Sequence, residues 1–326
     1  MIKVEKYSNT DHEGWNLMVN NSRNGTFLHN RNFMEYHSDR FSDFSLIVLE
    51  NSILVAIFPA NITDGTVISH GGLTYGGLLF PGNVTLRKSI LYFSKILKFL
   101  FSNKIAKLIY KPSPDFYHKV PSGELDFVLF LTDARLIRRD TSAILDLSLK
   151  LPFQERRRRG IKKAAKLNIN IRQDTGYATF WNNILIPNLQ NTYKVKPVHS
   201  LAEIEQLAYI LPENIKQFSA YVDDEIVAGC TIFETEIVAH TQYISASEFG
   251  KSSGAIDYLF SKLINDVYSG KKYFSFGSSN GIEPGEINFG LIEWKEGFGA
   301  RTICNDFYEI ETAKYKILEN YTLEND

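Results

Sequence analysis

The sequence is poor in the features that mark several common classes of protein. It holds only two cysteines, Cys230 and Cys304, in 326 residues. Two are too few for a disulfide framework and are typical of a reducing compartment. Neither belongs to a Cys-x-x-Cys pair, and the sequence contains no His-x-x-x-His. We therefore expect no metal site.

Long apolar runs and excess charge are also missing. No continuous apolar stretch approaches the ~20 residues of a membrane span, and the first residues lack the apolar core of a signal peptide. The formal net charge is −1, which argues against electrostatic binding of nucleic acid by the protein as a whole. These absences predict a cytoplasmic protein without a membrane span.

What the sequence does have is a soluble globular composition and a repeat. Apolar residues make up 44% and charged residues 22%, and the length favours two domains. Apolar runs around the turn Asn51-Ser52 resemble those around Asp223-Asp224, so that Leu54 matches Ile226 and His70 matches His240. In each half an amphipathic helix and a short apolar strand follow, at 85–104 and 105–114 in the first half.

Two further matches come later in the same order. Gly123 to Phe127 matches Gly285 to Phe289, and Ala134-Arg135 matches Ala300-Arg301. Ordered matches of this kind indicate a duplicated β-β-β-α-β-(loop)-β unit. A parallel return strand needs a helical crossover, so each unit predicts a mixed α/β sheet. We place the boundary near Lys150, which gives domains 1–150 and 151–326.

Three stretches of the second half carry a family resemblance: "RRRRGIKKAAKLNINI", "HTQYISASEFGKSSGAIDYLF" and "NFGLIEWKEGFGAR". With the duplication, they resemble two tandem GNAT acyltransferase domains, as in the Fem-type peptidyltransferases. The stretches "PVHSLAEIEQL" and "SHGGLTYGGLLF" resemble a subset found among polysaccharide biosynthesis enzymes. That resemblance implies transfer of an acyl group from acyl-CoA, such as acetyl-CoA or a short hydroxyacyl-CoA, to the amine of a dTDP- or UDP-linked amino sugar. The Fem enzymes proper imply a different donor, aminoacyl-tRNA, and a cell-wall precursor as acceptor; a binding module without catalysis is the third reading.

The resemblance places the acyl donor in the second half. GNAT domains hold the CoA pyrophosphate at the N-terminus of the helix that follows their fourth strand, where free N–H groups attract phosphate. Here Lys251, Ser252, Ser253 and Gly254 occupy that position, although their spacing departs from the family pattern. An ordinary capped helix is the structural alternative. The thioester oxygen would meet a main-chain N–H near Ile244 or Ser245, as in an oxyanion hole.

The glycine-rich stretch Val67–Phe80 lacks this donor pattern, so the first domain is expected to bind the acceptor. His70, Gly71, Gly72 and Tyr75 are its candidate contacts, with Tyr75 stacking on a base or a sugar. Glycine also serves turns, and a wide turn packed inside the protein is the competing interpretation.

Amine acylation needs a proton acceptor, and histidine titrates near neutral pH. His199 is the first candidate, while His240 lies in an apolar run where a buried core histidine is common. Asn288 and Lys295 are further candidates for substrate binding.

The run Arg156–Lys166, with seven basic residues in eleven positions, is either a solvated helix face or a site for tRNA, CoA or nucleotide phosphates.

Overall fold

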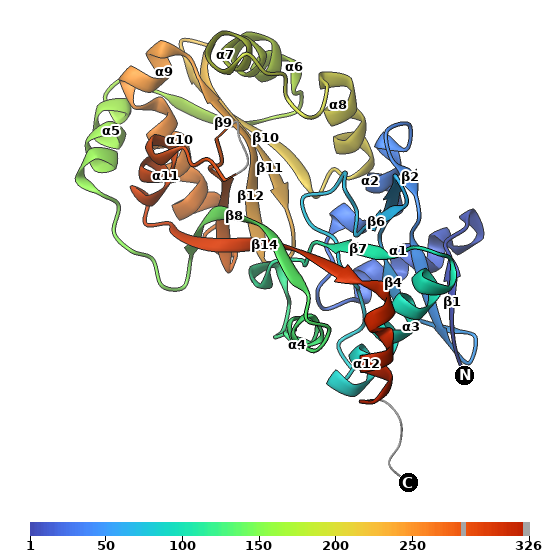
Figure 1. The fold of residues 1–326 in the computed structure, drawn as a ribbon. Coiled ribbons are helices and arrows are strands. Elements are labelled where there is room, and N and C mark those ends of the chain that lie inside the picture. The colour runs from blue at the N-terminus through green and yellow to red at the C-terminus, as the bar shows by residue number, and fades with distance from the viewer. Residues whose placement is uncertain (282–284, 322–326) are drawn as a thin grey trace. The chain divides into compact units, whose positions relative to one another are not determined.

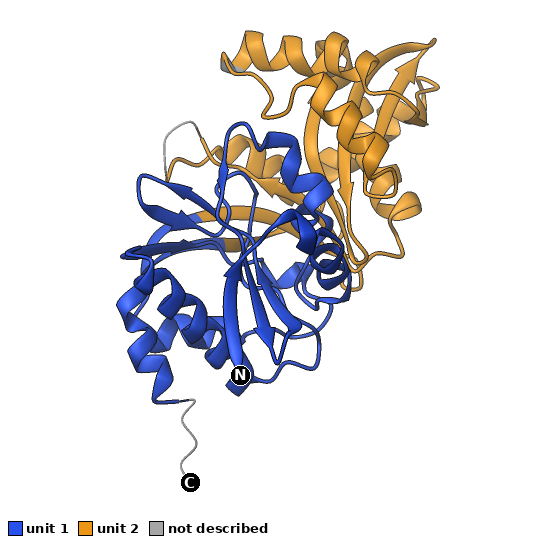
Figure 2. Ribbon diagram, turned by 90° about the vertical axis from the view of Figure 1, so that its right-hand side faces the viewer, with its two compact units in different colours: residues 1–139, 305–326 blue, residues 140–304 orange. Residues whose placement is uncertain are grey.

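The computed structural model describes residues 1–281 and 285–321, and of Tyr193 only the backbone. It divides the chain into two compact units (Figures 1 and 2). Unit 1 consists of Met1–Arg139 and Asn305–Asp326, and unit 2 of Asp140–Cys304. The strands β8 (Arg135–Asp146) and β14 (Arg301–Glu311) therefore each run from one unit into the other. This division differs from a boundary near Lys150 in two ways: unit 2 begins at Asp140, and the segment that starts at Asn305 belongs to unit 1.

Unit 1 contains two sheets. The first has the order β1-β3-β4, and the second has the order β2-β5-β6-β7 and continues into the second half of β14. The parallel pair is β6 with β7, where Val67 lies opposite Leu108 and Ile68 opposite Ile109. The strand bounds are β1 Ile2–Lys6, β2 Ser42–Asp43, β3 Leu46–Glu50, β4 Ile53–Phe58, β5 Asn61–Thr63, β6 Thr66–Ile68 and β7 Lys107–Tyr110.

The helices of unit 1 cover a core built on α3. This helix, Leu86–Ser102, starts at Thr85, whose side chain caps the Lys88 N–H, and it buries one face containing Phe93, Ile96 and Leu97. Its apolar residues recur at the helical period, as the sequence predicts. The other helices are α1 His12–Asn21, α2 Arg31–Met34, α4 Glu124–Leu131 and α12 Tyr315–Glu319.

Unit 2 contains a mixed sheet in the order β8-β13-β12-β11-β10-β9. Strands β9 to β12 are antiparallel neighbours, whereas β12 and β13 are parallel. The bounds are β9 Asn170–Asp174, β10 Ile215–Val222, β11 Glu225–Glu234, β12 Val238–Ala246 and β13 Tyr273–Ser278. The core lies between this sheet and α10, with Ala228, Cys230 and Phe260 fully buried.

The helices of unit 2 pack on the sheet and on one another. They are α5 Glu155–Ala165, α6 Ala178–Phe180, α7 Ile186–Asn188, α8 Leu201–Ile210, α9 Glu248–Ser253, α10 Ala255–Lys262 and α11 Phe289–Glu296, with π-helical turns at Trp181–Leu185, Leu189–Tyr193 and Leu263–Val267. Helix α10 contacts α5, α9 and the strands below it.

The repeat predicted from the sequence is confirmed in its main elements. The turns Asn51-Ser52 and Asp223-Asp224 both have two residues of positive φ, as two-residue hairpins of matching twist require. A parallel strand after a helix occurs in both units. Two details differ. The first meander is split between two sheets at Pro59, which has no N–H for a ladder, and helices α4 and α11 occupy the segments expected to be loops.

Candidate functional site

The strands β12 and β13 of unit 2 separate at one end. Their parallel pairing covers only three residue pairs, from Val238 opposite Tyr273 to His240 opposite Ser275. Both strands continue past that point, β12 to Ala246 and β13 to Ser278. Residues 241–246 of β12 and 276–278 of β13 are therefore not paired with each other, and we call the region between them the fork.

A buried lysine from α11 lies at the fork. Lys295 is 2% exposed, and its amine donates to the carbonyl oxygens of Gly277 (3.1 Å) and Ser278 (2.6 Å) at the end of β13. Burial lowers the pKa of its ammonium to about 7. A neutral amine has two hydrogens and one lone pair. When both hydrogens are donated to these two carbonyls, the lone pair remains to accept a proton.

His240 belongs to the same cluster. Its Nδ1 lies 2.9 Å from the Ser275 hydroxyl, and its ring packs against Gly277, where an added Cβ would come within 3.1 Å of Cε1. Burial, together with the nearby Lys295 charge, lowers the pKa of the ring to about 4. The imidazole is therefore neutral at pH 7 and acts in the fork as a hydrogen-bonding group rather than as a cation.

The candidate base His199 lies directly before the N-cap residue Ser200 of α8 and contacts β12 through Tyr243. It is 4% exposed and shares a 2.6 Å hydrogen bond between Nδ1 and the hydroxyl of Tyr243. Farther along the strand, the Ser245 hydroxyl accepts a hydrogen bond from the Asn188 amide at 3.0 Å. Ile244 and Ser245 lie in the part of β12 beyond its parallel pairing with β13.

The predicted phosphate site at residues 251–254 has a different local structure. The helix after β12 begins earlier, at Ser247, whose hydroxyl caps the Gly250 N–H. Lys251 pairs with Glu248 at 2.7 Å. Ser252 and Ser253 lie inside α9 and are not its N-cap. The signal for the true start is in the sequence, since a serine followed by an acidic first-turn residue is a common N-terminus.

Gly254 is needed for packing. It has a φ of +84°, and a Cβ at this position would overlap the carbonyl oxygen of Gly160 in α5. Helix α5 therefore lies directly against the junction of α9 and α10, where Lys163 also donates to the Ser252 carbonyl at 2.8 Å.

The basic run forms α5 and divides into a buried and an exposed part. Arg157 is 7% exposed and forms an ion pair with the buried Asp257 of α10, which also accepts from Trp294 Nε1 at 3.3 Å. Burial raises the pKa of Asp257, and the neighbouring Arg157 opposes that rise. Six other cations of the run are exposed: Arg156, Arg158, Arg159, Lys162, Lys163 and Lys166. The sequence could not separate Arg157 from its neighbours.

In unit 1 the position that corresponds to the start of α9, between β6 and α3, is occupied by a long segment of the chain. Residues 69–85 follow β6 before α3 begins, whereas only Ser247 separates β12 from α9. Gly76 donates to the carbonyl of Lys111, and Leu79 pairs with Ile57 of β4. The buried ammonium of Lys111 donates to the carbonyls of His70 (3.1 Å) and Leu73. Sequence reasoning missed Lys111, although a lysine directly after an apolar strand was a visible signal.

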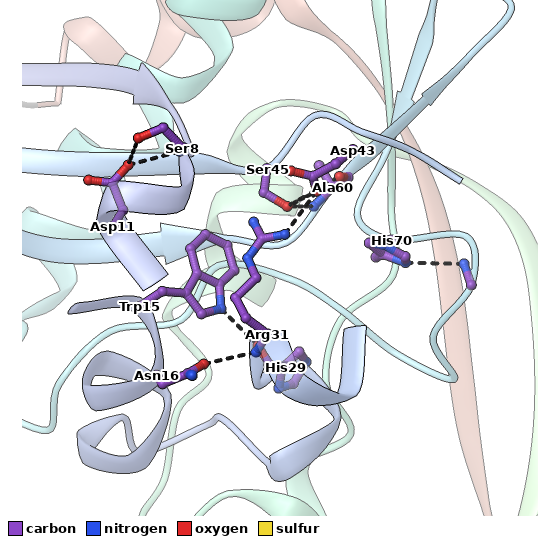
Figure 3. Close-up of polar contacts among 11 residues, drawn as sticks. Ser8, Asp11, Trp15, Asn16, His29, Arg31, Asp43, Ser45, Ala60 and His70 are labelled. Atoms are coloured by element: carbon purple, nitrogen blue, oxygen red, sulfur yellow. Dashed lines mark hydrogen bonds and ion pairs between the residues drawn. The ribbon is translucent and has the colours of Figure 1, made fainter. Parts of the chain in front are cut away.

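The glycine-rich stretch is packed closely inside unit 1. Tyr75 is 3% exposed and its hydroxyl lies 3.0 Å from that of Thr26, so its ring is not displayed for stacking. His70 is buried, and its Nδ1 accepts from the Gly72 N–H at 3.2 Å (Figure 3). Burial lowers the pKa of His70 to about 3. The N–H of Gly71 donates to Asn61 at 2.6 Å.

Replacing Gly72 with valine is expected to lower the melting temperature of the protein. A Cβ at this position would overlap the rings of His37 and Phe41, and overpacking of this kind costs roughly 1–3 kcal/mol. Thermal unfolding followed by circular dichroism measures the effect. Gly82→Ala is the matched control, because no atom lies within 4 Å of its added Cβ. A Gly72→Val protein with an unchanged melting temperature and weakened acceptor binding would instead show a loop that faces a ligand.

Asn288, the remaining predicted site residue, caps α11. Its side-chain oxygen accepts from the Leu291 N–H at 3.0 Å, and its own N–H donates to the Ser279 carbonyl at 2.8 Å. It thereby fixes the start of the helix that carries Lys295.

Within residues 1–281 and 285–321, no three His, Cys, Asp or Glu side chains are grouped as a metal site. Among the same residues, no helix is long and apolar enough to cross a membrane.

Comparisons with known proteins give structural relatives only. No family model matches the sequence, and no curated protein matches it. The solved structure of FemX is similar with a TM-score of 0.66 at 9% identity, covering 93% of this chain and 96% of that one. L-PGS from Bacillus licheniformis gives 0.60 at 10% identity, covering 97% and 96%. A tandem GNAT protein from the clavulanic acid biosynthesis pathway gives 0.50 at 11% identity, covering 96% and 99%.

These similarities extend over nearly the whole length of each chain. The fold is therefore a mixed α/β fold of the tandem GNAT and Fem type, as the sequence predicts. At identities of 9–11% they concern the fold alone, because one fold hosts many activities.

Proposed function

We propose that this protein is a Fem-type acyltransferase that moves an aminoacyl group from charged tRNA to an amine of a cell-wall precursor, at the fork of unit 2. The observation that carries the proposal is the buried amine of Lys295 between the separating strands β12 and β13. Buried amines with a pKa near 7 are concentrated at functional sites.

The chemistry follows from the two protonation states of Lys295. Its neutral amine takes a proton from the attacking acceptor amine as that nitrogen forms a bond to the ester carbonyl carbon. The tetrahedral intermediate then collapses, the bond to the ribose oxygen breaks, and the Lys295 ammonium returns the proton to that oxygen. Backbone N–H groups near Ile244 and Ser245 would stabilise the negative oxygen of the intermediate.

Two features of unit 2 favour a large polyanion over CoA as the donor. The first is that Lys251 is already paired with Glu248, while the Gly254 N–H already donates to the Lys251 carbonyl, so these expected pyrophosphate contacts are engaged within the protein. The second is the exposed cationic face of α5, whose one acidic residue is Glu155. For these reasons the Fem-type alternative takes precedence over the sugar N-acylation expected from the sequence.

The donor is tested by supplying each class separately. We expect the protein to discharge tRNA carrying a radiolabelled amino acid in the presence of a UDP-linked muramyl peptide, with label appearing in the peptide. Release of free thiol from acetyl-CoA without any discharge of tRNA would reject this donor.

A second candidate remains, the transfer of an acyl group from acyl-CoA to a dTDP- or UDP-linked amino sugar. It is favoured by the structural similarity to the tandem GNAT protein from the clavulanic acid biosynthesis pathway, and by the sequence resemblance to polysaccharide biosynthesis enzymes. Thiol release that depends on an amino-sugar nucleotide would establish it.

Reversing charges on the exposed face of α5 is expected to weaken donor binding in a salt-dependent way. Arg158, Lys162 and Lys166 follow at four-residue intervals, which places them about 6 Å apart on one side of the helix. The variant Arg158→Glu/Lys162→Glu should raise the KM for charged tRNA at least tenfold at low salt, with a smaller effect at high salt.

The matched control reverses two exposed lysines of unit 1, Lys3 and Lys104, which carry the same charges on another part of the chain. An equal rise in KM for both pairs would show a general charge effect. An unchanged KM for the α5 variant at low salt would show that the run is only a solvated face.

A further inference from the structure

A cavity of about 530 Å³ opens in unit 2 at the end of the sheet opposite the fork. The fork lies where β12 ends at Ala246. The cavity lies where β9 ends at Asp174 and β10 begins at Ile215, and helix α8 forms its other wall. Its volume falls within the range of small-molecule sites. None of the residues discussed for acyl transfer lines it.

The walls combine one displayed aromatic ring with hydrogen-bonding groups. Tyr209 of α8 is 87% exposed, so the faces of its ring are open to solvent beside the cavity. Gln173, Asp174, Glu205 and Lys216 supply donors and acceptors around it. Asp174 is held in place by the Tyr221 hydroxyl at 3.1 Å, and Lys216 by Glu234 at 2.9 Å.

This combination selects among ligand classes. Two carboxylates in the wall disfavour a phosphate or another anion. The polar side chains of the lining disfavour a purely apolar ligand, which would leave these groups without partners. A neutral ligand with one apolar face and many hydroxyl groups satisfies both the ring and the polar groups, and a pyranose is such a ligand.

We propose that this cavity is a glycan-binding site, in which the Tyr209 ring packs against a sugar face while Gln173, Asp174 and Glu205 bond its hydroxyl groups. The site is separate from the proposed transferase centre and does not depend on the identity of the acyl donor. It would hold a saccharide chain on unit 2.

A second cavity indicates that the ligand is longer than one sugar. It measures about 280 Å³ and shares Gln173 and Lys216 with the first. Tyr268, Lys271 and Glu236 belong to its lining. The two cavities therefore adjoin at Gln173 and Lys216 near the end of β9, an arrangement that suits a linear oligosaccharide.

The test is a calorimetric titration of the full chain with chitotetraose, cellotetraose and maltotetraose. We expect saturable binding of at least one of them. Tyr209→Ala should weaken that binding tenfold or more, whereas Tyr209→Phe, which keeps the ring, should stay within about threefold. Tyr321→Ala, which removes another exposed tyrosine, should bind like the wild type.

Two outcomes would overturn the proposal. One is the absence of saturable binding to all three oligosaccharides at millimolar concentration. The other is binding that Tyr209→Ala leaves unchanged, which would place the glycan elsewhere. Melting temperatures of all variants accompany the titration, and the exposure of Tyr209 predicts that they do not change.

Discussion

Replacing Lys295 with methionine is expected to lower the rate of acyl transfer by about 10²–10⁴-fold, the usual contribution of a positioned proton acceptor. Methionine has a similar length but offers neither a lone pair of comparable basicity nor a hydrogen-bond donor to Gly277 and Ser278. Lys295→Arg should not restore the rate, because a guanidinium stays protonated at neutral pH. Single-turnover transfer from charged tRNA measures both variants.

A stability control separates this loss from misfolding. The folded-state pKa of Lys295, about 7, lies below the ordinary value of 10.5. Between these values the unfolded chain binds a proton that the folded chain does not, so burial of Lys295 destabilises the protein less as the pH rises. From pH 7 to pH 9 the wild type should gain about 2–3 kcal/mol relative to Lys295→Met. A rate that survives the substitution, with this stability difference present, would remove Lys295 from the mechanism.

Replacing Arg157 with alanine is expected to destabilise unit 2 by about 3–5 kcal/mol, because it leaves the Asp257 carboxylate buried without its charge partner. Burial already raises the pKa of Asp257, and loss of Arg157 raises it further. Protonation of Asp257 at low pH removes the unpaired charge. The loss of stability caused by Arg157→Ala should therefore be smaller at pH 5 than at pH 8. Urea denaturation at the two pH values measures this.

Two further variants make the result specific. Arg158→Ala, which removes an exposed partner of Glu155, should change the stability by no more than about 1 kcal/mol. The double variant Arg157→Leu/Asp257→Leu should recover much of the loss, since it removes both buried charges. Equal effects of Arg157→Ala and Arg158→Ala would contradict the division of α5 into a buried and an exposed part.

Local sequence signals predicted much of the fold because they act over a few residues. The turns at Asn51-Ser52 and Asp223-Asp224 need positive φ, which Asn and Asp tolerate. The helix from Leu86 to Ser102 has a clear helical period. The segment after β13 that was expected to be a loop instead forms α11. This helix packs against the core through Trp294, and such tertiary packing cannot be read from the local sequence pattern.

The candidate site was less predictable because burial decides the role of each residue. His240 and Lys295 were both candidates, but the sequence does not show that they meet at the end of β13. The glycine-rich stretch was ambiguous from sequence, and its glycines lie where side chains would overlap neighbouring groups, as at Gly72. The acceptor role expected for residues 67–80 and the donor role expected for residues 251–254 remain predictions.

The pH dependence of kcat for acyl transfer, at saturating charged tRNA and acceptor, tests the central claim most directly. If neutral Lys295 is the proton acceptor, kcat should rise tenfold per pH unit below about 7 and level off above it. The residual rate of Lys295→Met should lack this inflection. A flat profile between pH 5.5 and 8.5 in the wild type, or the same inflection in the variant, would contradict acyl transfer assisted by Lys295 at the fork.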